Sequence, residues 1–362
     1  AGAKVMITRT RNSLQVEGAT GGAWQQDTGR TNFFNYNEGI SAAYTSLAGG
    51  WKKISVQAGL RAEYTSVLGQ SRDLKGEGLN KPDSTYLNLF PSLFLQYRPA
   101  PKHTLGLTAN RRIDRPAYQD QNPFIYALDA LNSEQGNPYL MPQFTNAVEL
   151  AYTYNNATSL KISYAKTTGY IGQLTYANGI TTVMIPQNAG TRQMVGISVS
   201  APVPVSKVLS TYFSLTPYYH YYEILLSGFG GLELQEGGSW GFNGYMSNTI
   251  QFKKGWKGSV SGWFNFQNRA TIYTARPLGS LDLGAQKNFL GDKATLKLSI
   301  VDLLNTQSWK QEAVTNSLQL TTYRKWESRN ITVGCSWRFG NTTIKKARER
   351  EGGNDGARIR EK

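Results

Sequence analysis

The sequence is poor in the residues that build catalytic and metal sites. Its 362 residues include one cysteine, Cys335, and two histidines, His103 and His220. One thiol excludes an internal disulfide and a thiolate cluster, and two histidines far apart in sequence argue against a structural zinc site. No nucleophile stands beside a candidate base in a recognisable constellation. We therefore expect no enzyme activity, no metal site and no cofactor.

Long apolar runs are also missing. No segment approaches the roughly 18 consecutive apolar residues that a membrane helix needs, and the mean hydropathy is −0.43. Such an average is still compatible with a transmembrane β-barrel, in which half of each strand faces water. The abundant residues fit a barrel: 21 Tyr and 8 Trp suit membrane interfaces, and 37 Gly suit tight turns and twisted strands.

Apolar and polar residues alternate with a period of two through most of the chain. In the segment 145–154, for example, Val148, Leu150 and Tyr152 alternate with smaller or polar residues. A helix would need a period near 3.6. The pattern predicts about 14 strands, which are longer than the roughly 5–6 residues usual in soluble proteins. They lie near residues 2–18, 32–47, 50–67, 84–98, 103–114, 143–154, 158–175, 180–201, 206–226, 237–253, 256–274, 278–290, 293–309 and 317–339.

Short and long connections alternate between these strands. The longer ones are 18–31, 69–83, 115–142, 227–236 and 310–316, although two connections on the same side, near 178–179 and 276–277, are short. Bacterial barrels have short periplasmic turns and long outer loops. The fold class that we predict is therefore all-β, a transmembrane antiparallel up-and-down β-barrel whose last strand ends on the periplasmic side.

The formal charge of +15 is compatible with a nucleic-acid partner, an anionic membrane surface or a basic lumen. Residues 341–362 hold seven basic and four acidic residues and three glycines. We interpret residues 1–340 as the barrel and residues 341–362 as a basic, polar periplasmic tail. A nucleic-acid-binding arm is the alternative for the tail, but we expect no nucleic-acid partner.

The motif Asn-Arg-Arg-Ile-Asp-Arg-Pro at 110–116 is followed by Gln-Asn-Pro-Phe at 121–124 and Gly-Asn-Pro-Tyr-Leu at 136–140. These motifs resemble those of the outer-membrane β-barrel family within the TonB-dependent receptors. Segments 36–44, 58–65, 89–92 and 336–340 add weaker similarity. The chain departs from the family pattern at Gln121, where Leu is usual, and at Gln143, where Glu is usual.

The resemblance implies a 22-stranded barrel in the bacterial outer membrane whose lumen is filled by a plug. About eight strands and the plug domain are then expected upstream of Ala1. The implied partners are outer-membrane lipid, the protein's own plug domain, the periplasmic TonB energy-coupling protein and the barrel assembly machinery. The implied function is energised import of a scarce nutrient, which could be a metal chelate, a glycan or a peptide.

The longest loop, 115–142, holds the candidate ligand-binding residues. Their rings and one guanidinium could contact a ligand, or the prolines could stiffen the loop while the rings pack together. These candidates are Arg115, Tyr118, Phe124, Tyr126 and Tyr139. The remaining motif residues are expected to be structural: Arg111, Arg112, Pro116, Asn122, Pro123, Gly136, Asn137 and Pro138. The alternation predicts a lumen face that includes Arg61, Glu63, Lys161, Lys297 and Arg338.

Two other functions remain open at this stage. A passive 14-stranded porin or apolar-solute channel fits the strand count, and a large soluble β-protein such as a propeller fits the all-β pattern. Strand length and the alternation of loop lengths argue against the propeller. The motif cluster favours the receptor over the porin.

Overall fold

The computed structural model describes residues 1–20, 22–28, 30–76, 80–228, 231–267, 273–291, 293–314 and 319–339. The predicted tail, 341–362, lies outside the described residues. No helix in the described part is long and apolar enough to cross a membrane.

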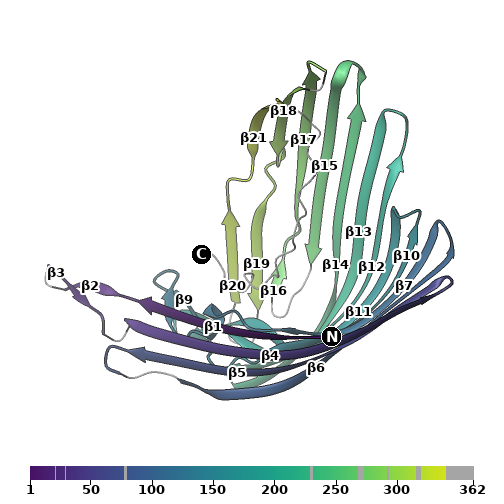
Figure 1. The fold of residues 1–362 in the computed structure, drawn as a ribbon. Coiled ribbons are helices and arrows are strands. Elements are labelled where there is room, and N and C mark those ends of the chain that lie inside the picture. The colour runs from purple at the N-terminus through teal and green to yellow at the C-terminus, as the bar shows by residue number, and fades with distance from the viewer. Residues whose placement is uncertain are drawn as a thin grey trace.

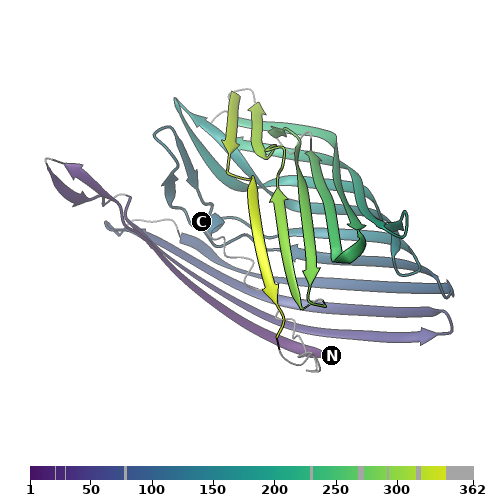
Figure 2. The same cartoon turned by 90° about the horizontal axis from the view of Figure 1, so that it is seen from above.

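Most of the chain forms one curved antiparallel sheet in which each long strand pairs with the next one along the chain (Figures 1 and 2). The path of the described part runs through β1 (Gly2–Leu14), β4 (Asn32–Trp51), β5 (Ile54–Asp73), β6 (Asn80–Ala100), β7 (His103–Asp114), β10 (Gln143–Tyr154), β11 (Thr158–Asn178), β12 (Thr181–Pro204), β13 (Leu209–Gly228), β14 (Gly231–Gln251), β15 (Trp256–Gln267), β17 (Leu278–Phe289), β18 (Ala294–Val301) and β21 (Asn330–Trp337). These are 14 strands, as the alternation predicted, and β1 and β21 are the two edges of the sheet.

Smaller elements lie at one end of the long strands. They are the hairpin of β2 (Glu17–Thr20) and β3 (Ala23–Gln26), the hairpin of β8 (Ile125–Ala127) and β9 (Asn132–Gln135), and a three-stranded sheet of β16 (Tyr273–Ala275), β19 (Ser308–Val314) and β20 (Gln319–Lys325). The described part also holds two short 3-10 turns: η1 (Gln119–Gln121) in the loop before β8, and η2 (Lys253–Gly255) in the short connection between β14 and β15. β9 joins the large sheet through parallel pairing with β12.

The two faces of the sheet differ in chemistry because side chains alternate along every strand. Leu150, Ile162 and Ile197 stand opposite one another on β10, β11 and β12, and each is more than 40% exposed. Thr145 and Thr167, on the other face of β10 and β11, are buried and joined by a 2.9 Å hydrogen bond. A register-matched band of bare aliphatic side chains indicates a lipid-facing surface, so the polar concave face lines the lumen.

Three of the predicted strands are each divided in two. The segments 256–274, 293–309 and 317–339 become β15 and β16, β18 and β19, and β20 and β21. The prediction of a loop over 310–316 is therefore wrong for residues 310–314, which belong to β19. The break after β18 centres on Asp302, which has a φ of 48° and lies fully buried among hydrogen-bond donors. Those donors divert the backbone from the ladder, which an alternation pattern cannot reveal.

Candidate functional site

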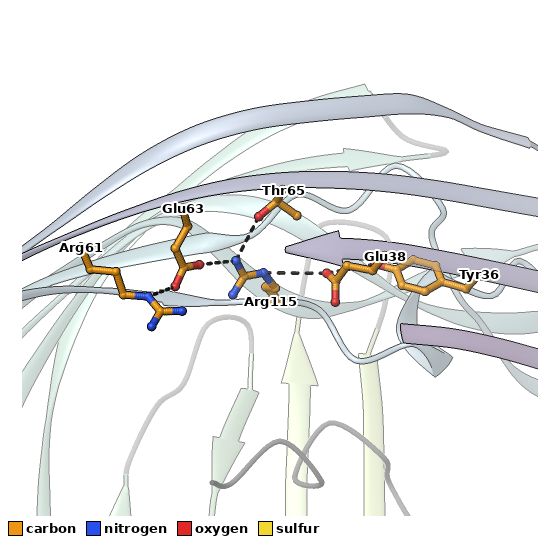
Figure 3. A network of polar contacts seen from close by, with 6 residues as sticks. All are labelled: Tyr36, Glu38, Arg61, Glu63, Thr65 and Arg115. Atoms are coloured by element: carbon orange, nitrogen blue, oxygen red, sulfur yellow. Dashed lines mark hydrogen bonds and ion pairs between the residues drawn. The ribbon is translucent and has the colours of Figure 1, made fainter. Parts of the chain in front are cut away.

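The loop between β7 and β10 is held against the concave wall by Arg115. Its Nη2 donates to Glu63 Oε2 at 2.6 Å and to Thr65 Oγ1 at 3.2 Å, both on β5. Its Nε lies 3.8 Å from Glu38 Oε1 on β4. Arg61 forms a further ion pair with Glu63 (Figure 3). Two cations thus neutralise two carboxylates on the inner wall, where Glu38 and Glu63 are buried.

The polar network continues from the wall into the loop through Tyr36. The Tyr36 hydroxyl donates to Glu38 Oε1 at 3.5 Å and accepts from Gln121 Nε2 at 3.3 Å. Gln121, whose side chain departs from the family pattern, is 1% exposed. A leucine there could pack but could not donate this hydrogen bond. Because buried polar groups need partners, Gln121 and the Tyr36–Glu38 pair fit each other.

Apolar packing supports the same junction. Tyr118 lies 4.9 Å from the Tyr36 ring, and Phe124 lies 6.5 Å from the Phe34 ring in an edge-on arrangement. These four rings and Val67 form one buried cluster, against which Tyr126 packs at its margin. Edge-on and offset ring pairs add about 0.5–1.5 kcal/mol beyond their buried area. The structure therefore places Tyr118 and Phe124 in a core and leaves little ring surface for a ligand.

The motif Gly136-Asn137-Pro138 ties the end of the loop to both its beginning and the wall. A Cβ on Gly136 would stand 2.1 Å from the carbonyl oxygen of Asn122, so any larger residue requires the backbone to move. Asn137 donates from its backbone N–H to Asp120 O at 2.7 Å and from Nδ2 to Pro186 O on β12 at 3.1 Å. The close approach of the Asn122 carbonyl to Gly136 explains the glycine at position 136, and the two hydrogen bonds to backbone carbonyls explain the asparagine at position 137.

Gln143, the other departure from the family pattern, forms hydrogen bonds through both the oxygen and the nitrogen of its side-chain amide. Its Oε1 accepts from the backbone N–H of Ile171 at 2.9 Å, and its Nε2 donates to Asp114 Oδ2 at 3.3 Å. A glutamate could accept the first bond but would place a second carboxylate beside Asp114. Asp114 and Gln143, paired directly across β7 and β10, are thus chemically matched.

The hairpin of β8 and β9 is closed by Asp129. Its carboxylate accepts hydrogen bonds from the side chain of Asn132 at 2.8 and 2.9 Å and from the backbone N–H groups of Leu131 and Asn132. The Asn132 side chain and these amides lower the pKa of Asp129 below its ordinary value. The hairpin tip therefore stays organised by a charged turn residue that faces solvent.

Beside this hairpin the concave side holds a cavity of about 420 Å³. It lies between β1, the loop and the far ends of β11 and β12, and most of its lining residues have polar side chains: Arg11, Asn12, Ser13, Gln119, Asp120, Tyr126, Glu134, Gln135, Gly136, Gln173, Met184 and Pro186. Of the five predicted ligand contacts, Tyr126 lines this cavity, and Tyr139 is 55% exposed elsewhere on the loop. The polar lining was not predicted, since its members come from four separate segments.

A serine and a histidine face each other further along the wall. Ser239, within the segment Gly-Gly-Ser-Trp-Gly at 237–241, is the cross-strand partner of His220. Both are buried, and His220 packs between Tyr218 and Tyr222 at ring distances of 4.6 and 5.7 Å. No carboxylate in the described part lies within ion-pair distance of the His220 imidazole. The described residues also contain no group of three His, Cys, Asp or Glu placed to hold a metal ion.

Comparisons with known proteins identify a family and several solved structures that share this architecture. The sequence pattern of the outer membrane protein β-barrel family matches residues 1–337, and no curated protein matches the chain. Among solved structures, the ferric yersiniabactin uptake receptor of Yersinia pestis is 12% identical, with a TM-score of 0.59 over 92% of this chain and 50% of that one. A copper transporter is 13% identical, with a TM-score of 0.59 over 93% and 54%. An iron transporter of Neisseria meningitidis is 16% identical, with a TM-score of 0.53 over 84% and 46%.

At such identities the solved structures show the fold alone, and this chain spans about half the length of each of them. Together with the family match, they confirm the predicted all-β outer-membrane barrel architecture. They also confirm the resemblance that was drawn from the motifs and the location in the bacterial outer membrane.

Proposed function

Because this chain belongs to the outer membrane protein β-barrel family, we propose that it forms part of the wall of a TonB-dependent transporter that imports a scarce nutrient. The observation that carries the proposal is the open sheet. β1 and β21 are not paired with each other in the described part of the chain. Within a bilayer each unsatisfied backbone group costs several kcal/mol, so both edges require partners. Further strands of a wider barrel supply them.

The polar inner wall supports the second part of the proposal. A barrel of about 22 strands is wide enough to need a plug, and a plug needs polar partners on the wall. The ion-paired surface around Arg61 and Glu63 supplies such groups. In this mechanism the periplasmic coupling protein pulls on the plug, while the wall and the anchored loop 115–142 stay rigid. No step requires a catalytic side chain in the wall.

We propose a metal chelate as the substrate class, ahead of a glycan or a peptide. The similar solved structures are named as iron, ferric yersiniabactin and copper transporters. The loop supplies the ligand contacts, with Tyr126 at the cavity and the exposed Tyr139 as the best-placed rings. Arg115, Tyr118 and Phe124 hold the loop from beneath, because their surfaces are already committed to the wall.

Planar-bilayer recording of the refolded 362-residue chain tests the proposal. A wall segment with two unpaired edges should insert poorly or give irregular leaks. A passive 14-stranded porin is the second candidate, favoured by the even number of strands on the path. It would give a stable, uniform and solute-selective conductance. That result would contradict the transporter-wall proposal and establish the porin.

A further inference from the structure

A row of four polar side chains crosses the lipid-facing side of the sheet. Arg111 on β7 pairs with Asn146 on β10, Asn146 pairs with Lys166 on β11, and Lys166 pairs with Gln193 on β12. Directly opposed residues in neighbouring strands point to the same face. With strands about 4.8 Å apart, the backbones of Arg111 and Lys166 are about 10 Å apart, with the Asn146 amide between them.

The row lies at the border of the apolar band. Counting two residues from the row toward the short turns, the next residues on the same face are Ala109, Val148, Tyr164 and Val195. Val148 is 46% exposed, Tyr164 is 42% exposed and Val195 is 48% exposed. The Tyr164 hydroxyl donates to Gln193 Oε1 at 3.0 Å across this border. On its other side the row approaches loop 115–142, which belongs to the long-loop side and hence to the cell exterior.

Arg111 and Lys166, the two cations of the row, differ from cations of the lumen wall in whether a carboxylate of the described part lies beside them. Arg115 and Lys161 on the concave face contact Glu63 at 2.6 Å and Glu149 at 3.2 Å. Across the residues that the structure describes, no carboxylate stands within ion-pair distance of Arg111 or Lys166. The Arg111 guanidinium lies 5.0 Å from the Phe144 ring centroid, and its buried Nε has no hydrogen-bond partner among the described residues.

The same arrangement recurs on the neighbouring part of the sheet. Arg72 on β5 pairs with Phe33 on β4, and its guanidinium lies 5.8 Å from that ring. Arg9 on β1 shares this outer face, since it alternates with the same register as the exposed Val5 and Ile7. The outer faces of β1 and β5 thus carry further cations, Arg9 and Arg72.

We propose that Arg111, Asn146 and Lys166 bind the phosphate of a phosphorylated glycolipid in the outer leaflet, with its acyl chains lying along Val148 and Leu150. Arginine and lysine are the standard partners of phosphate, and the arginine can bind through two parallel hydrogen bonds. The aliphatic row beneath them accepts the chains, so one surface matches both halves of the lipid. This site is independent of the proposed transport function, because it requires only a barrel in the outer membrane.

Native mass spectrometry of the detergent-extracted protein, titrated with bis-phosphorylated lipid A, tests the site. Each basic side chain near a membrane surface contributes about 1 kcal/mol, so the double variant Arg111→Gln/Lys166→Gln should bind about 30-fold more weakly. The charge-retaining variant Arg111→Lys/Lys166→Arg should keep most of the affinity. Lipid A without phosphates should bind the wild type and the double variant equally weakly.

The matched control is Arg112→Gln/Lys297→Gln, which removes the same charge from the lumen face. It should bind lipid A as the wild type does. An equal loss in the control would attribute binding to net charge and overturn the proposal, as would an unchanged affinity in Arg111→Gln/Lys166→Gln. Inorganic phosphate that bound as tightly as lipid A would show a free-anion site and would also contradict a lipid site. Retention of the wild-type circular dichroism spectrum by every variant establishes that each is folded.

Discussion

Arg115 is the residue on which the junction between loop and wall depends. It is one of two cations that face a pair of buried carboxylates, and its side chain is 12% exposed. A buried ion pair adds little stability compared with an apolar replacement, but removing one partner leaves a charge without compensation and typically costs about 3–5 kcal/mol. The network therefore specifies where loop 115–142 docks, more than it raises the stability of the wall.

We predict that Arg115→Met lowers the free energy of unfolding in lipid vesicles by about 3–5 kcal/mol, since Glu38 and Glu63 lose their shared cation. Loop 115–142 should also become cleavable by protease. Arg112→Met, three residues earlier and without an ion pair in the described part, should change stability by less than about 0.5 kcal/mol. Adding Glu63→Gln to Arg115→Met should recover part of the loss. Equal effects at Arg112 and Arg115 would contradict the anchoring role.

At the scale of elements, Asp302 determines where β18 ends. Its Oδ1 accepts from the backbone N–H and the hydroxyl of Thr306, at 2.9 and 3.1 Å, and its Oδ2 accepts from the backbone N–H of Gln307 at 3.2 Å. Ser328, which lies just before β21, donates to the same carboxylate. One side chain thus interrupts two adjacent strands together and sets apart the sheet of β16, β19 and β20.

The pH dependence of this turn follows from its hydrogen bonds. Burial acts to raise the pKa of Asp302, but the bonds from Ser328, Thr306 and Gln307 outweigh it and lower the pKa to about 2. Because the pKa of Asp302 is lowered, its carboxylate stabilises the turn at pH values above the ordinary pKa of 3.8. This stabilisation is lost as the pH falls toward 2 and the carboxylate becomes protonated.

Hydrogen-exchange protection factors of the Thr306 and Gln307 amides should therefore fall between about pH 4 and pH 2. Asp302→Asn should reproduce the loss at neutral pH, whereas Asp129→Asn, in a separate turn, should leave both amides protected. Protection that stayed constant down to pH 2 would show that the carboxylate does not hold this turn.

At the scale of the whole molecule, the decisive property is which face meets lipid. Leu150 and Ser163 lie on adjacent strands but on opposite faces, since Leu150 pairs with Ile162 and Ser163 pairs with Glu149. We predict that Leu150→Arg costs about 2–4 kcal/mol in unfolding from lipid vesicles, because it places a cation in the hydrocarbon. Ser163→Arg, which points into the lumen, should cost far less. Equal losses at the two positions would contradict the assignment of the faces.

The sequence by itself determined the number of strands on the path of the large sheet and the face on which their side chains lie, although it did not reveal that three predicted segments are each divided into two strands. Alternation with a period of two is a local property, because it requires only that neighbouring side chains on a strand point to opposite faces of the sheet. The faces of Leu150 and Glu149 can therefore be assigned without knowing which strands pair with theirs. The motifs at 110–116 and 136–140 determined the family for the same reason, since they are contiguous. The position of the longest loop also followed from the sequence alone.

Only the tertiary structure decided what the loop residues do. Arg115 meets Glu63 across 52 positions of sequence, and Ser328 reaches Asp302 across 26, so neither contact leaves a local pattern. Among five candidate ligand contacts, Tyr118 and Phe124 became core because they pack against Phe34, Tyr36 and Val67 of β4 and β5, whereas Tyr126 lines the cavity. Side-chain identity states what a residue can contact, and the fold determines which of those contacts exist.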